Sequence, residues 1–306
     1  MPRHEMSGAH PSGRDPEIGI LGLSDVLAAA RAKLFFVVGA PRSGTTWVQR
    51  ALDAHPQISC VGEGHFLDEL APPLARALGA YGQNVRFRSK LSLGDELAFL
   101  PFDEPDKLLS LAVLLLMTRN GRPGSLWIGE KTPDNVFFLD RLSRIFPDAR
   151  FVHVYRDPRD VCVSAWINNL RMGRSQALEK WRDFAGYVPV HARSWANRMV
   201  AARRFASAHP QSYYEVAYEA LSAEFESAFL GLLRFLGSPA DSEIVSRCRE
   251  ASSFERAAGR AIGTEDPNSH FRKGESGNWR AHFDASLARI YAEIAGTEMR
   301  LLGYEP

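Results

Sequence analysis

The residues best suited to chemistry lie directly after an apolar run, where a phosphate-binding loop is expected. The string GAPRSGTTW, residues 39–47, has two glycines separated by four residues and followed by two threonines. Nucleoside triphosphatases carry lysine after the second glycine of such a loop, and that lysine reaches the β- and γ-phosphates. Thr45 occupies this position here, and Arg42 is the only cation of the loop. The loop therefore favours an anionic ligand other than a nucleoside triphosphate.

The elements that flank this loop explain why it would bind an anion. The run LFFVV (34–38) predicts a buried parallel strand, and GTTWVQRALDA (44–54) has the spacing of a helix. A helix that starts after a glycine-bearing turn presents backbone amides and a positive dipole end. The hydroxyls of the two threonines and the permanent charge of arginine add donors. The predicted anion ligands are Arg42, Ser43, Gly44, Thr45 and Thr46. The alternative is an ordinary strand-to-helix turn with a surface arginine.

Two further segments repeat a basic turn. FVHVY (151–155) predicts a second strand, which RDPRD and the helical string VCVSAWINNL follow. Near the C-terminus, FRKGESGNWRAHF (271–283) has two adjacent cations before a glycine, which suits a phosphate clamp of side chains and a backbone amide. Each of these segments therefore adds a further candidate position for a phosphate.

Together these motifs resemble those of sulfotransferases that use 3′-phosphoadenosine 5′-phosphosulfate (PAPS). PRSGTTW is similar to the 5′-phosphosulfate loop of that family, in which tyrosylprotein and several bacterial branches carry arginine and many cytosolic members lysine. The segment around FVHVYRDPRD resembles the 3′-phosphate motif, which implies Arg156 and Ser164 as ligands of that phosphate. The alternative is a surface pair of Arg156 with Asp157 and no role for Ser164.

The resemblance also assigns the C-terminal motif and the adenine site. FRKGESGNW is close to the RKG-x-x-GDW signature of cytosolic sulfotransferases, with Asn278 where aspartate is common. It implies that the 3′-phosphate also contacts Arg272, Lys273 and Gly274. SSFER resembles the segment whose aromatic side chain stacks on adenine, and AYEAL resembles a strand end beside the nucleotide. The residues implied by these matches are Phe254, with Trp47 on the other adenine face, and Tyr218. For Phe254 and Trp47, the alternative is a place in the hydrophobic core.

Sulfuryl transfer requires a site that stabilises negative charge on the leaving phosphate and a base that takes the acceptor's proton. Arg42, the two threonines of the loop and Lys131 in GEKTPDN are the candidate stabilisers, and no metal is expected. Pro133 stands where cytosolic sulfotransferases carry a catalytic histidine. LDAHPQISCVGEGHF resembles a tyrosylprotein sulfotransferase stretch whose catalytic glutamate matches Glu63. A partly desolvated pocket would raise the pKa of this carboxyl group.

Other residues compete for the role of the base. His65 follows Glu63 closely and is a candidate base or acceptor contact, whereas His55 at a helix end is expected to be structural. Glu130 is a further candidate base, with an ion pair to an arginine as the alternative. Instead of acting as the base, Glu63 could cap a helix or pair with an arginine.

The strand–helix alternation predicts an α/β fold with three α/β/α layers around a central parallel sheet, as in the P-loop sulfotransferases. A third strand is expected at 213–218 and a helix at 221–236. We expect a flexible leader over residues 1–30 and a single domain over residues 31–306. Residues 65–125 read as a helical insertion that would serve as a lid, with a buried helix at LLSLAVLLLM (108–117).

Composition limits the possible partners. The chain has 306 residues, 45% of them hydrophobic, and a net charge of +1, so no bulk attraction to nucleic acid or to a membrane is expected. Its longest apolar run is too short to span a bilayer, and three cysteines without paired spacing suit a reducing, cytoplasmic location.

The predicted function is sulfuryl transfer from PAPS to a hydroxyl or amine, with adenosine 3′,5′-bisphosphate (PAP) as product. The acceptor is a small molecule or a peptide, and the oligomeric state is open. The resemblance places HF after Glu63 where tyrosylprotein sulfotransferases have TR, so His65 replaces an arginine that contacts acidic peptides. The alternatives are a P-loop kinase with a degenerate loop and a nucleotide-binding protein without activity.

Overall fold

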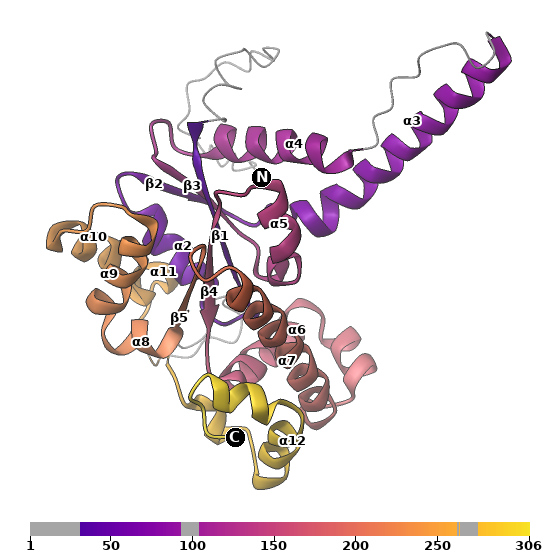
Figure 1. Cartoon of the computed structure of the whole chain (residues 1–306). Coiled ribbons are helices and arrows are strands. Elements are labelled where there is room, and N and C mark those ends of the chain that lie inside the picture. Colours follow the sequence, from indigo (N-terminus) through magenta and orange to yellow (C-terminus); the bar gives the residue numbers. More distant parts are fainter. Residues whose placement is uncertain (1–30, 93–103, 262, 264–274) are drawn as a thin grey trace, which may run out of the picture.

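The protein is built around one parallel β-sheet (Figure 1). The computed structural model describes residues 31–92, 104–261, 263 and 275–306. The described sheet has the strand order β2–β3–β1–β4–β5, and every neighbouring pair is parallel. Its strands are β1 (Lys33–Gly39), β2 (Ile58–Val61), β3 (Trp127–Lys131), β4 (Arg150–Tyr155) and β5 (Tyr213–Ala217). The predicted α/β fold with a central parallel sheet is confirmed.

The strand order determines where a ligand site can form. After β1 the chain continues to β2 and β3 on one side, and after β4 it continues to β5 on the other side. The loops after β1 and β4 therefore flank the point where the strand order reverses, which is the usual position of ligands on such sheets. The register aligns Val37 of β1 with Lys131 of β3, and Gly39 with Val154 of β4. The carboxyl ends of these three strands are therefore close together.

Helices cover both faces of the sheet. The helices of the described chain are α2 (Thr45–Asp53), α3 (Ala71–Ser92), α4 (Pro105–Asn120), α5 (Leu139–Ile145), α6 (Pro158–Trp181), α7 (Phe184–Ala208), α8 (Tyr218–Ala223), α9 (Phe225–Leu236), α10 (Ser242–Ser252), α11 (Phe254–Ala258) and α12 (Ala285–Leu301). A π-helical turn, η1 (Phe66–Leu70), precedes α3, and two 3-10 turns, η3 (Pro133–Phe138) and η4 (Asn278–Ala281), follow β3 and precede α12. Figure 1 shows α9 and α10 on one side of the sheet and α5 on the other.

The central strand β1 contributes to both hydrophobic cores because its side chains alternate between the faces. Phe36 and Val38 pack with residues of α4, α5 and α7, whereas Phe35 and Val37 pack with residues of α2, α9 and α10. A third cluster joins α6, α7 and α12 around Trp195. A strand that is buried on both faces explains the unbroken run LFFVV in the sequence.

The insertion between β2 and β3 is helical, as predicted, but its described part does not cover the cleft described below. α3 extends away from the body of the molecule (Figure 1). In α4 one side is buried through Leu109, Val113 and Met117, while Leu111 and Leu116 are exposed. No described residue between 66 and 125 lines the cleft. Of the predicted insertion, His65 is the one described residue that lines the cleft, so the lid stays a prediction, and the prediction of a buried helix holds for one side of α4.

One other expectation needs adjustment. The helix predicted at 221–236 is divided into α8, which already begins at Tyr218, and α9. The leader predicted at residues 1–30 lies outside the described residues.

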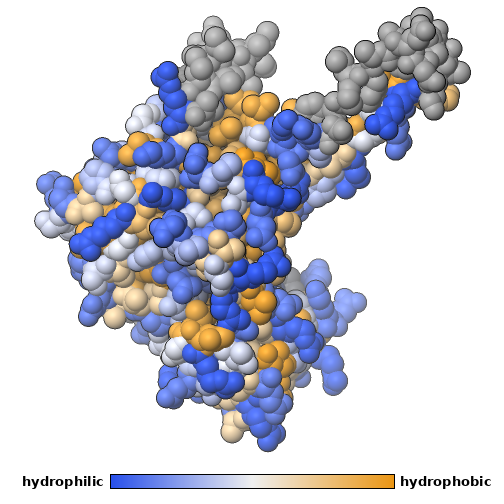
Figure 2. Space-filling model, viewed as in Figure 1, coloured by the Kyte–Doolittle hydropathy of each residue, from blue (hydrophilic) through white to orange (hydrophobic). Residues whose placement is uncertain are grey.

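In the described part of the chain, we find no helix with the length and apolar character needed to cross a membrane. The face drawn in Figure 2 is largely hydrophilic, with smaller groups of hydrophobic residues between.

Candidate active site

One cleft of about 590 Å³ is lined by residues that follow each of the five strands. Most of the site residues predicted from the sequence lie on its wall, although they come from segments far apart in the chain. These residues are Arg42, Gly44, Thr45, Thr46, Trp47, Glu63, His65, Arg156, Ser164, Tyr218 and Phe254. Arg272, Lys273 and Gly274 lie outside the described residues. The parallel topology thus brings the first two cationic turns into a common cleft.

The loop after β1 owes its shape to two residues with left-handed backbone. Arg42 has φ 76° and Gly44 has φ 101°. At Gly44 a Cβ atom would lie 2.6 Å from the Tyr218 ring, so only glycine allows this close contact. α2 begins at the next residue, and no described side chain caps its N-terminus. The first amides of such a helix have no acceptor within it, and Gly44, Thr45 and Thr46 line the cleft, so the start of α2 is suited to an anion.

Ser43 differs from its neighbours in the loop. It is fully buried, and its Oγ donates to the Val154 carbonyl at 2.9 Å. Its amide donates to the Ala40 carbonyl at 3.1 Å. The structure therefore does not bring the Ser43 hydroxyl to the cleft, and the residue ties the loop to β4.

The loop after β1 contacts the helix that follows the second cationic turn. The Nε atom of Arg42 donates to the Oγ atom of Ser164 at 3.2 Å. Ser164 lies two turns into α6, and this helix begins with Pro158 after an N-cap aspartate whose side chain accepts from the Arg159 amide. The cap and the proline fix the start of α6, and Ser164 thereby reaches the loop after β1.

Arg156 is held in the cleft by neighbours on three sides. Its Nη2 donates to the Glu275 carbonyl at 2.6 Å and lies 3.8 Å from Asp160, and its guanidinium lies 4.2 Å from the centre of the Tyr218 ring. Its Nε is buried and has no hydrogen-bond partner among the described residues. The alternative of a surface pair with Asp157 is wrong, because Arg156 is buried and Asp157 pairs with Arg159.

Asp160 is a structural anchor that the sequence analysis did not single out. It is buried, and its carboxylate accepts from the amides of Gly277 at 2.6 Å and Trp279 at 2.9 Å. It therefore fixes the described segment that directly follows the predicted phosphate clamp. The signal was available in RDPRD, where the last aspartate lies one helical turn after Arg156.

Aromatic side chains form one part of the cleft. Trp47 meets Tyr218 edge to face with ring centroids 5.3 Å apart, and it also lies 6.0 Å from Phe225. Phe254 is the first residue of α11 and is half-buried, and the guanidinium of Arg260 lies 5.3 Å from its ring centre. Trp47 and Phe254 line the same cleft. Two flat side chains are thus available for stacking on a base.

Glu63, on the wall of the cleft, forms an ion pair with Lys131. Lys131 is the last residue of β3, and only 5% of its side chain is exposed, against 42% for Glu63. Burial raises the pKa of Glu63, but the hydrogen bond and charge of Lys131, together with His65, outweigh it and leave this pKa lowered. The expected rise in the pKa of Glu63 is therefore wrong. Glu63 is an ionised carboxylate at neutral pH.

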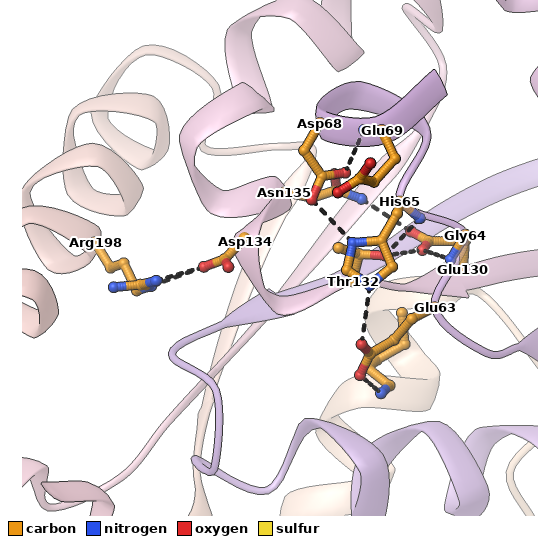
Figure 3. A network of polar contacts seen from close by, with 11 residues as sticks. Glu63, Gly64, His65, Asp68, Glu69, Glu130, Thr132, Asp134, Asn135 and Arg198 are labelled. Carbon is orange, nitrogen blue, oxygen red and sulfur yellow. Dashed lines mark hydrogen bonds and ion pairs between the residues drawn. The ribbon is translucent and has the colours of Figure 1, made fainter. Parts of the chain in front are cut away.

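His65 lies between two carboxylates. Its Nε2 is 3.3 Å from Glu63 Oε2, and its Nδ1 is 2.9 Å from Asp68 Oδ2 (Figure 3). The hydrogen bond to Asp68 raises the pKa of His65 above its ordinary value of 6.5, against the opposing effect of burial. The backbone of His65 is left-handed with φ 47°, and its amide donates to the Thr132 hydroxyl at 3.3 Å.

Glu130 lies beneath this pair and does not line the cleft. It is fully buried, and it accepts hydrogen bonds from the Gly64 amide at 2.8 Å, from Asn135 at 2.9 Å and from the Thr132 hydroxyl. Burial raises its pKa to about 7. Glu130 therefore positions the backbone between Glu63 and His65 and has no contact with the space available to a substrate. Its described partners do not include the arginine considered in the sequence analysis.

His55 has the structural role expected for it. It is buried, its Nε2 lies 2.8 Å from the Pro239 carbonyl, and its Nδ1 accepts from the Gln57 amide at 3.1 Å. The sequence analysis also missed several residues on the cleft wall, some of them inside the motifs that it quoted. Examples are Asp134, Asn168, Arg171, Arg249 and Ser253.

The sequence between residues 35 and 242 matches the sulfotransferase family. The match covers more than half of the chain, so the chain belongs to the sulfotransferase family. It is similar to protein-tyrosine sulfotransferase 2 of Gallus gallus, with 24% identity over 294 residues, 89% of this chain and 70% of the relative. It is 31% identical to human protein-tyrosine sulfotransferase 1 over 126 residues, 41% of this chain and 32% of the relative.

A third relative is an uncharacterized protein of Aquifex aeolicus, 27% identical over 217 residues, 69% of this chain. The matched region spans 26% of that relative, so it corresponds to about a quarter of a longer protein. Among solved structures, the fold resembles mouse sulfotransferase SULT7A1 complexed with PAP, with TM-score 0.56, 17% identity and coverage of 88% and 85% of the two chains. Sulfotransferase STF9 of Mycobacterium avium has TM-score 0.56, 15% identity and coverage of 92% and 80%.

Proposed function

We propose that this protein transfers the sulfuryl group of PAPS to a hydroxyl or amine of an acceptor and releases PAP. The observation that carries the proposal is the common cleft of Arg42 and Arg156, which follow the adjacent strands β1 and β4. Two fixed cations in one cleft suit a ligand with an anionic group at each end. A PAP-bound relative of the same fold supports this choice.

The cleft has donors suited to each part of such a ligand. Arg42, the two threonines and the N-terminal amides of α2 would hold the 5′-phosphosulfate. Arg156 and Ser164 would hold the 3′-phosphate, and the Arg156 Nε atom, buried without a described partner, is a donor that such an oxygen would satisfy. Trp47 and Phe254 would flank the adenine.

The charges near Glu63 suit transfer by general-base catalysis. The Glu63 carboxylate is ionised and lies on the cleft wall, so it would take the proton of the acceptor. Lys131, with Arg42, would stabilise the negative charge that develops on the leaving phosphate. His65, Asp134 and Arg171 line the cleft near the expected position of the acceptor, whose identity we leave open between small molecules and peptides.

The test combines binding with activity. PAP should stabilise the protein without added metal, by roughly 2.7 kcal/mol at a hundredfold excess over Kd. ATP with Mg²⁺ should stabilise it much less, whereas the converse result would favour a kinase. Labelled sulfate should then pass from PAPS to at least one member of a panel of phenols, alcohols, sugars and peptides. Binding of PAP without any release of labelled sulfate would leave a nucleotide-binding protein and refute the enzymatic function.

A further inference from the structure

We propose that His65 and Asp68 form a proton relay that removes the acceptor's proton from Glu63 after each sulfuryl transfer. This proposal rests on the proposed function. Sulfuryl transfer releases one proton, because the acceptor's O–H or N–H bond is replaced by a bond to sulfur. If Glu63 takes this proton, its carboxylate is neutral until the proton leaves, and a second turnover requires the ionised form.

The geometry provides a path from Glu63 to water. Nε2 of His65 lies 3.3 Å from Glu63 Oε2, and Nδ1 lies 2.9 Å from Asp68 Oδ2 (Figure 3). In neutral His65, an Nδ1–H that donates to Asp68 leaves the lone pair of Nε2 directed at Glu63. The proton then moves from Oε2 to Nε2, the resulting imidazolium is stabilised by the Asp68 carboxylate, and water removes the proton. With side chains 43% and 32% exposed, His65 and Asp68 are accessible to water.

The protonation energies favour this direction of transfer. The pKa of Glu63 is lowered, because Lys131 and His65 outweigh the effect of burial, while the hydrogen bond to Asp68 raises the pKa of His65. A proton on Glu63 is therefore less stable than a proton on His65. Lys131 cannot serve as the relay instead, because its ammonium group already donates to Glu63 Oε1.

Two further features fix the positions of His65 and Asp68. Asp68 lies one helical turn after His65 in η1, and the left-handed backbone of His65 turns the chain into that element. The amides of Gly64 and His65 are fixed by Glu130 and the Thr132 hydroxyl. The ionisable groups around His65 come from its own segment, from η1 and from the segment that ends β3 and begins η3. They are Glu63, Asp68, Glu69, Glu130, Lys131 and Asp134, the last of which pairs with Arg198 of α7.

The relay predicts a specific pH dependence. Only neutral His65 accepts a proton, so kcat should rise with pH through the raised pKa of His65, above 6.5. In Asp68→Asn the hydrogen bond that raises this pKa is weakened, so the acidic limb of the profile should move to lower pH. In His65→Gly this limb should disappear, and kcat near neutral pH should fall by roughly 10-fold, less than the roughly 10²–10⁴-fold contribution of a general base. Glycine suits the left-handed backbone at this position.

The experiment measures the loss of labelled sulfate from PAPS with 2-naphthol as the acceptor. Hydrolysis of PAPS, in which water is the acceptor, is the background reaction. Added imidazole should restore the kcat of His65→Gly but not that of Glu63→Gln. Glu69→Gln is the matched control, because it removes an exposed neighbouring carboxylate whose side chain has no described hydrogen bond to His65. PAP-induced thermal stabilisation of every variant verifies an intact donor site.

The outcomes separate the relay from the proposed function. Sulfate release by the unaltered protein, a shifted limb in Asp68→Asn and rescue by imidazole support the relay. Release with an unchanged profile in Asp68→Asn, or no rescue of His65→Gly, overturns the relay and leaves the transferase intact. If the unaltered protein transfers no labelled sulfate to 2-naphthol or to any other member of the panel above, the proposed function fails and the relay fails with it.

Discussion

The loop after β1 and the segment from Glu63 to Asp68 lie on the same cleft but are built in different ways. The loop is shaped by its backbone, through the left-handed residues Arg42 and Gly44 and the uncapped start of α2. The segment from Glu63 to Asp68 depends on side chains of other elements, above all Lys131 and Glu130.

This difference has consequences for what each region can do. A backbone site presents fixed donors whose strength does not depend on pH, which suits an anion that stays charged. A site made of ionisable side chains holds protons whose positions change with the neighbouring charges. We therefore expect substitutions in the loop to alter donor binding, and substitutions around Glu63 to alter turnover and pH dependence.

The largest effect is expected from Glu63→Gln, which removes the proposed proton acceptor and keeps the shape of the side chain. Turnover should fall by roughly 10²–10⁴-fold, because an amide cannot accept the proton of the acceptor. Stabilisation by PAP should be almost unchanged, since Glu63 is assigned no contact with the nucleotide. The measurement is kcat for labelled sulfate transfer, alongside a thermal-shift titration. Normal turnover in this variant would mean that another group is the base.

Arg42→Ala should give the next largest effect and should act on binding as well as turnover. Loss of one charged donor at a developing negative charge costs roughly 10²–10³-fold in rate. The affinity for PAP should fall too, which distinguishes this variant from Glu63→Gln. Arg204→Ala is a matched control, because Arg204 is an exposed arginine that pairs with Asp140. Unaltered PAP affinity in Arg42→Ala would break the distinction between the two regions.

The same distinction explains how far the sequence predicted the site. The loop and the position of Arg156 could be predicted, because glycines, hydroxyls and a cation at the end of an apolar strand leave a local pattern. The lowered pKa of Glu63 could not, because it depends on Lys131, 68 residues away. The parallel sheet followed from the strand–helix alternation, whereas the strand order, the projecting α3 and the exposed leucines of α4 did not. Continuous apolar runs do not reveal which side of a helix remains exposed.

Phe254→Ala should have a moderate effect and tests the donor side without touching a charge. Stacking of a base on an aromatic side chain contributes roughly 1–3 kcal/mol, so the Kd for PAP should rise about 10-fold. Because Phe254 is half-buried, the stability of the free protein should change little. Isothermal titration with PAP measures the first quantity and urea unfolding the second. Phe87→Ala on α3 is the control, since that ring is 65% exposed. A large loss of stability with unchanged Kd would identify Phe254 as a core residue.

The smallest effect on chemistry, and the sharpest test of the side-chain region, comes from Glu130→Gln. Burial raises the pKa of Glu130 to about 7, from an ordinary value of 4.5. Between these values the folded state binds more protons than the unfolded state, so this group makes the free energy of unfolding fall as pH rises from about 4.5 to about 7.

Glutamine does not titrate, so the free energy of unfolding of the variant lacks this dependence on pH. The glutamine amide occupies the same space as the carboxyl group. The unfolding free energy of the unaltered protein, minus that of Glu130→Gln, should therefore decrease over this window by at most about 3 kcal/mol and be constant above it. Urea unfolding of both proteins across the window measures the difference. Asp160→Asn is the comparison, since Asp160 is equally buried but accepts its hydrogen bonds from the amides of Gly277 and Trp279. A difference that increases with pH would mean that Glu130 is ionised throughout and that the network around Glu63 is held by its charge.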